Sequence, residues 1–180
     1  EAETAKINRA VRSTSSLALF YENKLIEAVF HSSSGGRTEN SGQVWKYQLP
    51  YLRSVIDYDQ NSTKYRWSKK ISSSELDKIF SDIGGLNSIQ IKKKSNSDRV
   101  LVIKLYGPKG TKNISGKNLR KNLKLLSNKF DVNLKFNHIN LENKLNSDNK
   151  VVVNPALEPL PPIPTDYFLL VKGYGAGHGV

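Results

Sequence analysis

The sequence of 180 residues predicts an α+β fold, in which a mixed β-sheet body carries an inserted β-α-β-β-α subdomain. Three observations lead to this prediction. Apolar residues alternate on both sides of a polar turn near residue 23, which is typical of a β-hairpin. Two helix-start signals, at Ser72 and Ser115, are separated by two strand-like runs. A further strand-like run, FLLVKGYG, returns at residues 168–175. A chain of this length can bury the core of one domain.

The first predicted element is a hairpin within residues 16–32, SLALFYENKLIEAVFHS, with its turn at residues 22–24. Residues 30–40, FHSSSGGRTEN, follow its second strand. Glycines beside small hydroxyl residues let the backbone approach a ligand closely, so this loop is either a tight structural turn or a binding surface. Residues 45–59 are aromatic-rich and interrupted by Pro50, so we expect an extended segment there.

The inserted subdomain begins with a strand at residues 66–71 and a helix opened by the capping box of residues 72–75. The strands SIQIKKK and RVLVIKLY follow, and a second helix starts at the cap residue Ser115. The apolar side chains expected to be buried on the two helices are Leu76, Ile79, Phe80 and Ile83, then Leu119, Leu123 and Leu126. The cations expected on the exposed side of the second helix are Lys117, Arg120, Lys121 and Lys124.

The predicted domain division places residues 1–59 and 138–180 in the body and residues 60–137 in the insertion. Residues 137–150 are rich in asparagine and lysine, which favours a variable loop. Residues 154–166, NPALEPLPPIPTD, predict a polyproline-like spacer.

The amino-acid composition and charge limit the partners, covalent links and membrane segments that this chain can have. A net charge of +12 indicates a polyanionic partner, for which nucleic acid, anionic lipid and acidic polysaccharide all qualify, although a solvated basic face is an equal alternative. The absence of cysteine excludes disulfides and thiolate metal sites from this segment. No apolar run reaches the roughly 18 residues that a membrane span needs. The chain contains no methionine and begins at Glu1, so we expect it to be the interior of a longer protein, with a signal peptide or anchor able to precede it.

Several catalytic and binding motifs are tested and set aside. GYGAGHG places His178 where the dinucleotide fingerprint requires a glycine, and Gly116-Lys117 lacks the spacing of a phosphate-binding loop. His31 precedes three serines, but neighbouring side chains on a strand point to opposite faces, and a triad also needs an orienting carboxylate. His31 and His178 lack a third assigned ligand for zinc. No metal and no cofactor are therefore expected.

Four segments, in order, resemble the SpoIID/LytB sporulation and cell-wall family. FHSSSGGRTENSGQVWKYQLPYLRSV is similar to its SxGGxTE...W....PYL segment, and ISGKNLRKNLKLLSNKF to its xSGxxxRxxLxLxSxxF segment. GYGAGHGV resembles its GxGxGHGV signature, and residues 7–30 resemble its AVxxTxGxxLxYxxxxIxAxF pattern. The resemblance runs in register over nearly all the chain except residues 137–166.

The resemblance implies a protein that acts on peptidoglycan, either as a lytic transglycosylase on glycan strands stripped of stem peptides or as a non-catalytic enhancer of a cell-wall amidase. It implies export to the cell envelope or the outer face of the membrane. A membrane contact would arise only through a segment outside this chain. A nucleic-acid binder is a third alternative that only the charge supports, so no nucleic-acid partner is expected. A basic groove with aromatic side chains would suit a stripped strand, which exposes a lactyl carboxylate on each muramic acid. Candidate stacking residues are Trp45, Tyr47, Tyr51 and Trp67.

The predicted site combines the serine-glycine loop with the glycine-rich end. The residues expected to contact substrate are His31, Ser32, Ser33, Ser34, Gly35, Gly36, Thr38, Glu39, Tyr51, Gly175, Gly177 and His178. We expect the two segments to lie close together. The resemblance places the family's catalytic glutamate upstream of Glu1, so no catalytic residue is assigned and the 180 residues are expected to bind without cleaving. Glu39 is expected in a polar, wet turn with a structural or sugar-contacting role.

Overall fold

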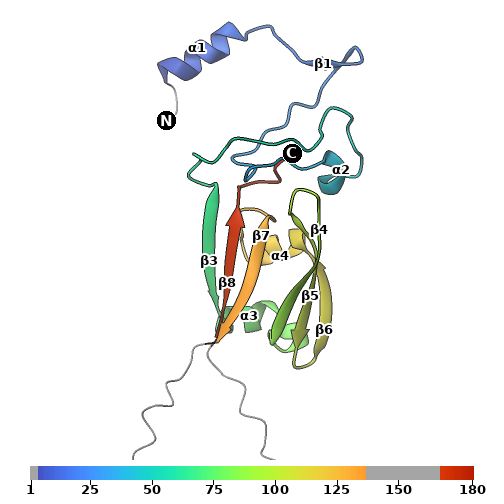
Figure 1. Cartoon of the computed structure of the whole chain (residues 1–180), viewed down its shortest axis with the longest axis vertical. Coiled ribbons are helices and arrows are strands. Elements are labelled where there is room, and N and C mark those ends of the chain that lie inside the picture. Colours follow the sequence, from blue (N-terminus) through green and yellow to red (C-terminus); the bar gives the residue numbers. More distant parts are fainter. Residues whose placement is uncertain (1–3, 137–166) are drawn as a thin grey trace, which may run out of the picture.

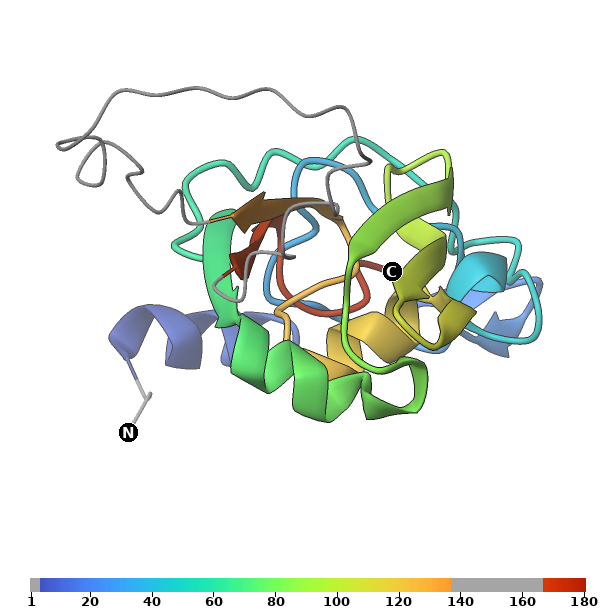
Figure 2. The same cartoon turned by 90° about the horizontal axis from the view of Figure 1, so that it is seen from below.

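Two three-stranded antiparallel sheets and two short helices hold the core of this computed structural model, which describes residues 4–136 and 167–180 (Figure 1). The first sheet has the strand order β3-β8-β7 and the second the order β4-β5-β6. Helices α3 and α4 lie together along one side of the two sheets (Figure 2). Every strand pair among the described residues is antiparallel.

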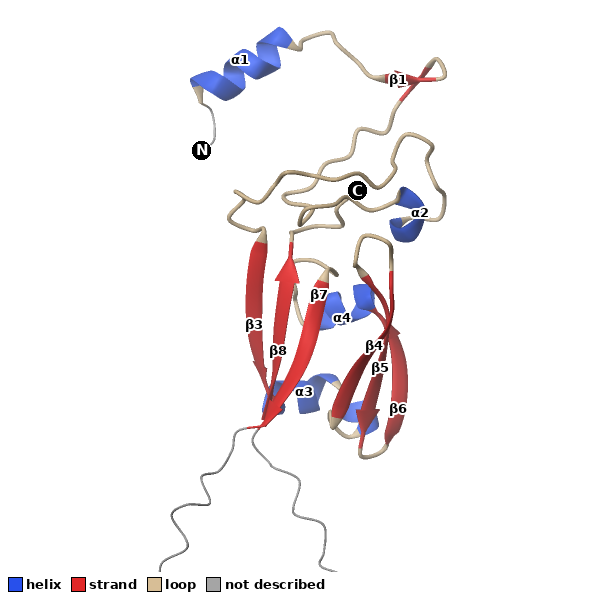
Figure 3. Ribbon diagram, in the orientation of Figure 1, coloured by secondary structure: helices blue, strands red, loops and turns tan. Residues whose placement is uncertain are grey.

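The elements follow one another as Figure 3 shows. The helices are α1 (Ala5–Ser13), α2 (Ser41–Val44), α3 (Ser73–Ile79), the 3-10 helix η1 (Ser81–Ile83) and α4 (Gly116–Asn122). The strands are β1 (Phe20–Tyr21), β2 (Lys24–Leu25), β3 (Arg66–Ser72), β4 (Ser88–Lys94), β5 (Val100–Gly107), β6 (Gly110–Ser115), β7 (Phe130–Phe136) and β8 (Tyr167–Tyr174). The α+β class predicted from the sequence is confirmed.

The core joins both sheets through alternating strand residues. Leu169 and Val171 of β8 are fully buried, as are Ile103 and Leu105 of β5. Alternation arises because successive side chains on a strand point to opposite faces. The two helices add Leu76 and Leu119 to the same cluster, and Leu123 follows directly after α4; none of the three has exposed surface.

Both predicted helix starts are confirmed. The Ser72 hydroxyl accepts a hydrogen bond from the Glu75 amide at 3.3 Å, and the Ser115 hydroxyl accepts one from the Asn118 amide at 3.1 Å. Such caps satisfy backbone donors that have no partner inside the helix. One predicted core residue is wrong: Leu126 is 42% exposed, while Leu125 is 6% exposed. Helix α4 ends at Asn122 and Lys124 takes a left-handed backbone conformation, so the helical period no longer applies beyond it.

Four elements were not predicted from the sequence: α1, α2, β6 and β7. Strands β6 and β7 complete the two sheets, so the inserted region contains more strands than the predicted β-α-β-β-α order. The domain division stays a prediction. Strand β8, from the predicted body, pairs with both β3 and β7, from the predicted insertion.

The hairpin near residue 23 forms, with Glu22 and Asn23 in left-handed conformations, but each strand has only two residues. Its apolar side chains stay exposed because it stands away from the two sheets (Figure 1). The predicted variable loop and polyproline-like spacer lie outside the described residues. No helix among residues 4–136 and 167–180 is long and apolar enough to cross a membrane.

Candidate functional site

The serine-glycine loop and the glycine-rich end meet directly, as predicted. Ser33 and Ala176 form an antiparallel bridge in which each amide donates to the other's carbonyl oxygen, at 3.3 and 2.8 Å. Gly175 has φ +71°, and a Cβ atom there would lie 2.6 Å from the Ser33 carbonyl oxygen. A side chain at this position would therefore be strained and would push the two segments apart.

The C-terminal segment is fixed along its length by four different parts of the chain. The Trp67 indole N–H donates to the Gly175 carbonyl oxygen at 2.8 Å, and the Gly177 amide donates to the Leu126 carbonyl at 3.0 Å. The Glu39 amide donates to the Gly179 carbonyl at 2.8 Å. His31 Nδ1 donates to the Val180 backbone oxygen at 3.0 Å.

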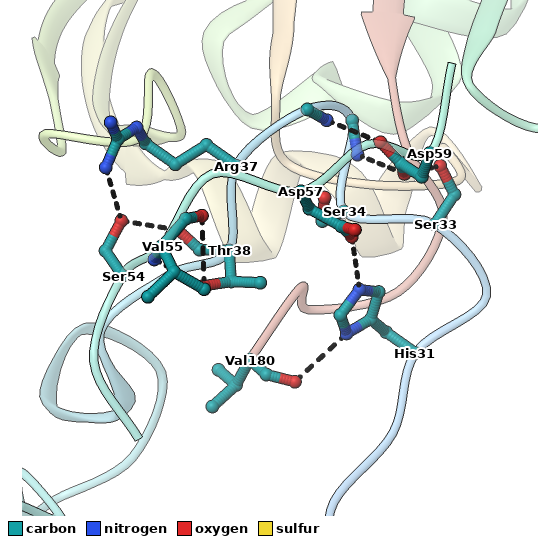
Figure 4. Close-up of polar contacts among 12 residues, drawn as sticks. His31, Ser33, Ser34, Arg37, Thr38, Ser54, Val55, Asp57, Asp59 and Val180 are labelled. Atoms are coloured by element: carbon teal, nitrogen blue, oxygen red, sulfur yellow. Dashed lines mark hydrogen bonds and ion pairs between the residues drawn. The ribbon is translucent and has the colours of Figure 1, made fainter. Parts of the chain in front are cut away.

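The Asp59 side chain holds the serine-glycine loop through hydrogen bonds (Figure 4). Its carboxylate accepts hydrogen bonds from the Ser33 hydroxyl and from the amides of Gly35 and Gly36, at 3.0 and 2.8 Å. Partial burial acts to raise the pKa of Asp59, but the hydrogen bonds from Ser33, Gly35 and Gly36 together outweigh it and lower the pKa overall. Asp59 therefore holds the loop in place as an anion.

His31 and Thr38 also serve to connect backbone segments (Figure 4). His31 Nε2 lies 3.5 Å from the Asp57 carboxylate. The Thr38 amide donates to the Val55 carbonyl, and the Thr38 hydroxyl accepts from the Val55 amide, both at 2.9 Å. Both side chains thus join the loop to residues 55–57.

Glu39 is buried, which contradicts the prediction of a wet turn. It is 2% exposed, and its carboxylate accepts hydrogen bonds from the hydroxyls of Ser95 and Ser97 in the β4–β5 turn and from the Asn40 amide. The sequence could not show this, because Ser95 lies 56 residues further along the chain. Glu39 therefore has the geometry of a structural anchor rather than of an exposed sugar contact.

Arg99 is buried, at 1% exposure, and contacts the backbone of the serine-glycine loop. Its guanidinium donates to the carbonyl oxygens of Ser34 and Arg37, at 2.8 and 3.1 Å, and to the Ser97 hydroxyl at 3.0 Å. Burial lowers the pKa of Arg99, while the charges of Glu39 and Asp59 act to raise it. Arg99 thereby connects the serine-glycine loop to the β4–β5 turn.

A cavity of about 350 Å³ opens beside these contacts. Phe30 and Trp45 provide its aromatic side chains and residues 177–180 provide one wall, with Ala28 and Val29 completing the lining. A second cavity, of about 470 Å³, lies beside it and shares His178 as a lining residue. Its other lining side chains come from α4 and the turn that follows.

The remaining predicted site residues are divided between the surface and the interior. Ser32 is exposed, whereas the Ser34 hydroxyl is buried and has no hydrogen-bond partner among the described residues. Tyr51 packs on Tyr21 with ring centroids 5.4 Å apart and does not line the aromatic cavity. Of the four stacking candidates, Trp45 reaches that cavity, and Trp67 packs against the core.

His31 and His178 make separate contacts. His178 Nδ1 lies 3.5 Å from the Arg120 guanidinium, while His31 faces Asp57 and Val180. Among the described residues no three His, Asp or Glu side chains are grouped to hold a metal ion. The sequence reasoning missed Asp57, Asp59 and Arg99. No local pattern marks any of the three, because their partners are distant in the chain.

The fold and site together define an α+β domain in which a serine-glycine loop is bridged to a glycine-rich C-terminal segment beside an aromatic cavity. The chain is 35% identical over 129 residues to the stage II sporulation protein D of Bacillus amyloliquefaciens, covering 70% of this chain and 36% of that protein. It is 33% identical over 134 residues to stage II sporulation protein D of Bacillus subtilis strain 168, covering 73% and 38%.

A third similarity is to the amidase enhancer of Bacillus subtilis strain 168, at 37% identity over 70 residues, which cover 39% of this chain and 10% of that protein. No family model matches the chain. These similarities support the resemblance to the SpoIID/LytB family, and the chain spans well under half the length of the curated relatives that it matches.

Proposed function

We propose that this chain binds peptidoglycan glycan strands stripped of their stem peptides, as part of a SpoIID-like protein that remodels the cell wall at the envelope. The observation that carries the proposal is the aromatic cavity formed by Phe30, Trp45 and residues 177–180. Aromatic rings offer a large apolar surface at small entropic cost, which suits the apolar face of a sugar ring.

The rigidity of the cavity wall supports binding. Residues 175–180 are held by hydrogen bonds from Trp67, Glu39 and His31, so the wall needs little ordering when a strand arrives. Binding to a preorganised surface loses less conformational entropy than binding to a loose one.

We assign these residues to binding rather than to bond cleavage. General acid catalysis on a glycosidic bond needs a protonated carboxylic acid within reach of the glycosidic oxygen. The residues that line the aromatic cavity include no Asp or Glu within the described part of the chain. Glu39 is held by two serine hydroxyls in the interior. In a lytic transglycosylase the acid would therefore come from elsewhere in the whole protein.

A binding assay with purified, stripped glycan strands tests the proposal. Trp45→Ala should weaken binding about tenfold, the equivalent of about 1.4 kcal/mol. Tyr47→Ala is the matched control, because Tyr47 is 66% exposed, lies two residues away and does not line the cavity. Equal losses in both variants, or no binding by the unmodified chain, would overturn the proposal.

The similarity to an amidase enhancer supports a second candidate, a non-catalytic module that stimulates a cell-wall amidase. The two are separated by adding the chain to intact peptidoglycan with and without such an amidase. Faster release of stem peptides, with no anhydro-sugar ends by mass spectrometry, would favour the enhancer.

A further inference from the structure

The cavity beside α4 has a strongly cationic lining. Lys117, Lys121 and Lys124 are exposed there, Arg120 is half-buried, and His178 forms the boundary with the aromatic cavity. No Asp or Glu lines this cavity within the described residues. The three ion pairs found among those residues involve other cations, so these charges are available to an external anion.

Arg120 is oriented rather than free to move. Its Nε donates to the Leu125 carbonyl oxygen at 3.3 Å, and its Nη1 lies 3.5 Å from His178 Nδ1. The remaining guanidinium N–H groups have no partner among the described residues. A planar guanidinium held in this way presents donors that match the two oxygens of a carboxylate.

His178 lines both cavities, and their other lining residues differ. The aromatic cavity has His178 as its only ionisable lining side chain within the described part of the chain, whereas the cavity at α4 has four Lys and Arg side chains. A ligand that fills both must combine an uncharged, ring-like part with an acidic group beside it. A phosphodiester polymer, charged at every unit, would place anions over the uncharged cavity.

We propose that the α4 cavity is a subsite for the carboxylate of an acidic glycan, with Arg120 as its specificity-determining residue and Lys117 and Lys121 as supporting charges. For the proposed glycan strand this group is the lactyl carboxylate that a stripped muramic acid exposes. The inference rests on the proposed function and adds to it the chemical group that α4 recognises.

The test compares binding to stripped glycan strands and to the same strands with their carboxyl groups reduced to alcohols. Lys117→Gln/Lys121→Gln and, separately, Arg120→Lys should each weaken binding to the acidic strands about tenfold and leave binding to the reduced strands unchanged. Arg120→Lys keeps the charge and removes the planar donor pair. Lys92→Gln/Lys93→Gln, which removes two exposed charges from β4, is the matched control and should change neither.

Each other outcome overturns a defined part of the reasoning. Failure of the unmodified chain to bind either kind of strand would remove the proposed function. Binding that is equal for both strands and insensitive to the α4 variants would overturn the carboxylate subsite and leave the proposed function in place. Equal losses in the α4 and β4 variants would show that only net charge matters. Tighter binding to polyphosphate than to the acidic strands would reassign the cavity to phosphate polymers.

Discussion

Replacing Glu39 by glutamine should destabilise this protein without acting on any catalytic step. The substitution keeps the shape of the side chain and removes its charge. In the structure the Glu39 carboxylate accepts hydrogen bonds from two serine hydroxyls and one amide, at 2% exposure. Its charge also faces buried Arg99, to which it is linked through the Ser97 hydroxyl.

The expected magnitude follows from these contacts. Hydrogen bonds to a charged group contribute roughly 1.5–3 kcal/mol each and neutral ones roughly 0.5–1.5 kcal/mol, so about 1 kcal/mol is lost at each serine. Leaving Arg99 less compensated adds to this loss. We expect Glu39→Gln to lower the free energy of unfolding by about 2–3 kcal/mol, a fall in Tm of about 4–12 °C for a chain of this size.

Urea unfolding followed by tryptophan fluorescence measures the change. Glu27→Gln, at an exposed position, is the control and should stay within about 0.5 kcal/mol of the unmodified chain. Combining Glu39→Gln with Arg99→Met should cost less than the sum of the single changes, because the two charges compensate each other. Unchanged stability would refute this reasoning. Strand cleavage by the unmodified chain that Glu39→Gln abolishes would identify Glu39 as a catalytic acid.

Three further predictions follow from the site. The hydrogen bonds that lower the pKa of Asp59 stabilise the fold above the unfolded pKa of this residue, and this stability is lost as pH falls through the lower folded pKa. The difference in stability between the unmodified chain and Asp59→Asn, measured by urea unfolding from pH 7 to pH 2, should therefore disappear on acidification. A constant difference would contradict the prediction. Burial, and then the charges of Arg120, Lys117 and Arg99, lower the pKa of His178, so it becomes a cation only below the ordinary range of a histidine. Affinity for acidic strands should rise as pH falls below that range, and His178→Gln should abolish that rise in a titration series. Gly175→Ala should lower the free energy of unfolding by at least about 2 kcal/mol more than Gly110→Ala. Both glycines have positive φ, but only a Cβ atom at Gly175 would clash with backbone atoms. Equal shifts in Tm would disprove the close packing of Gly175 against the Ser33 backbone.

The sequence by itself determined the elements whose signals are local. The caps at Ser72 and Ser115 and the alternating strands at 88–94 and 99–106 act over a few residues, so their patterns predicted the structure directly. The sequence also predicted that the serine-glycine loop and the glycine-rich end lie close together, because both contain glycines that let backbone segments approach each other. Glycines with positive φ mark close backbone approach, and Gly35 and Gly175 provide it.

Only the tertiary structure decided which side chains hold that site together. Arg99 donates to a carbonyl 65 residues away, Glu39 accepts from a turn 56 residues away, and Asp59 reaches a loop 23 to 26 residues back. None of these contacts has a sequence period, because each depends on how loops from separate elements pack. The same holds for Arg120 and His178, which lie 58 residues apart. The pattern showed a basic helix, and the fold placed it beside an aromatic cavity.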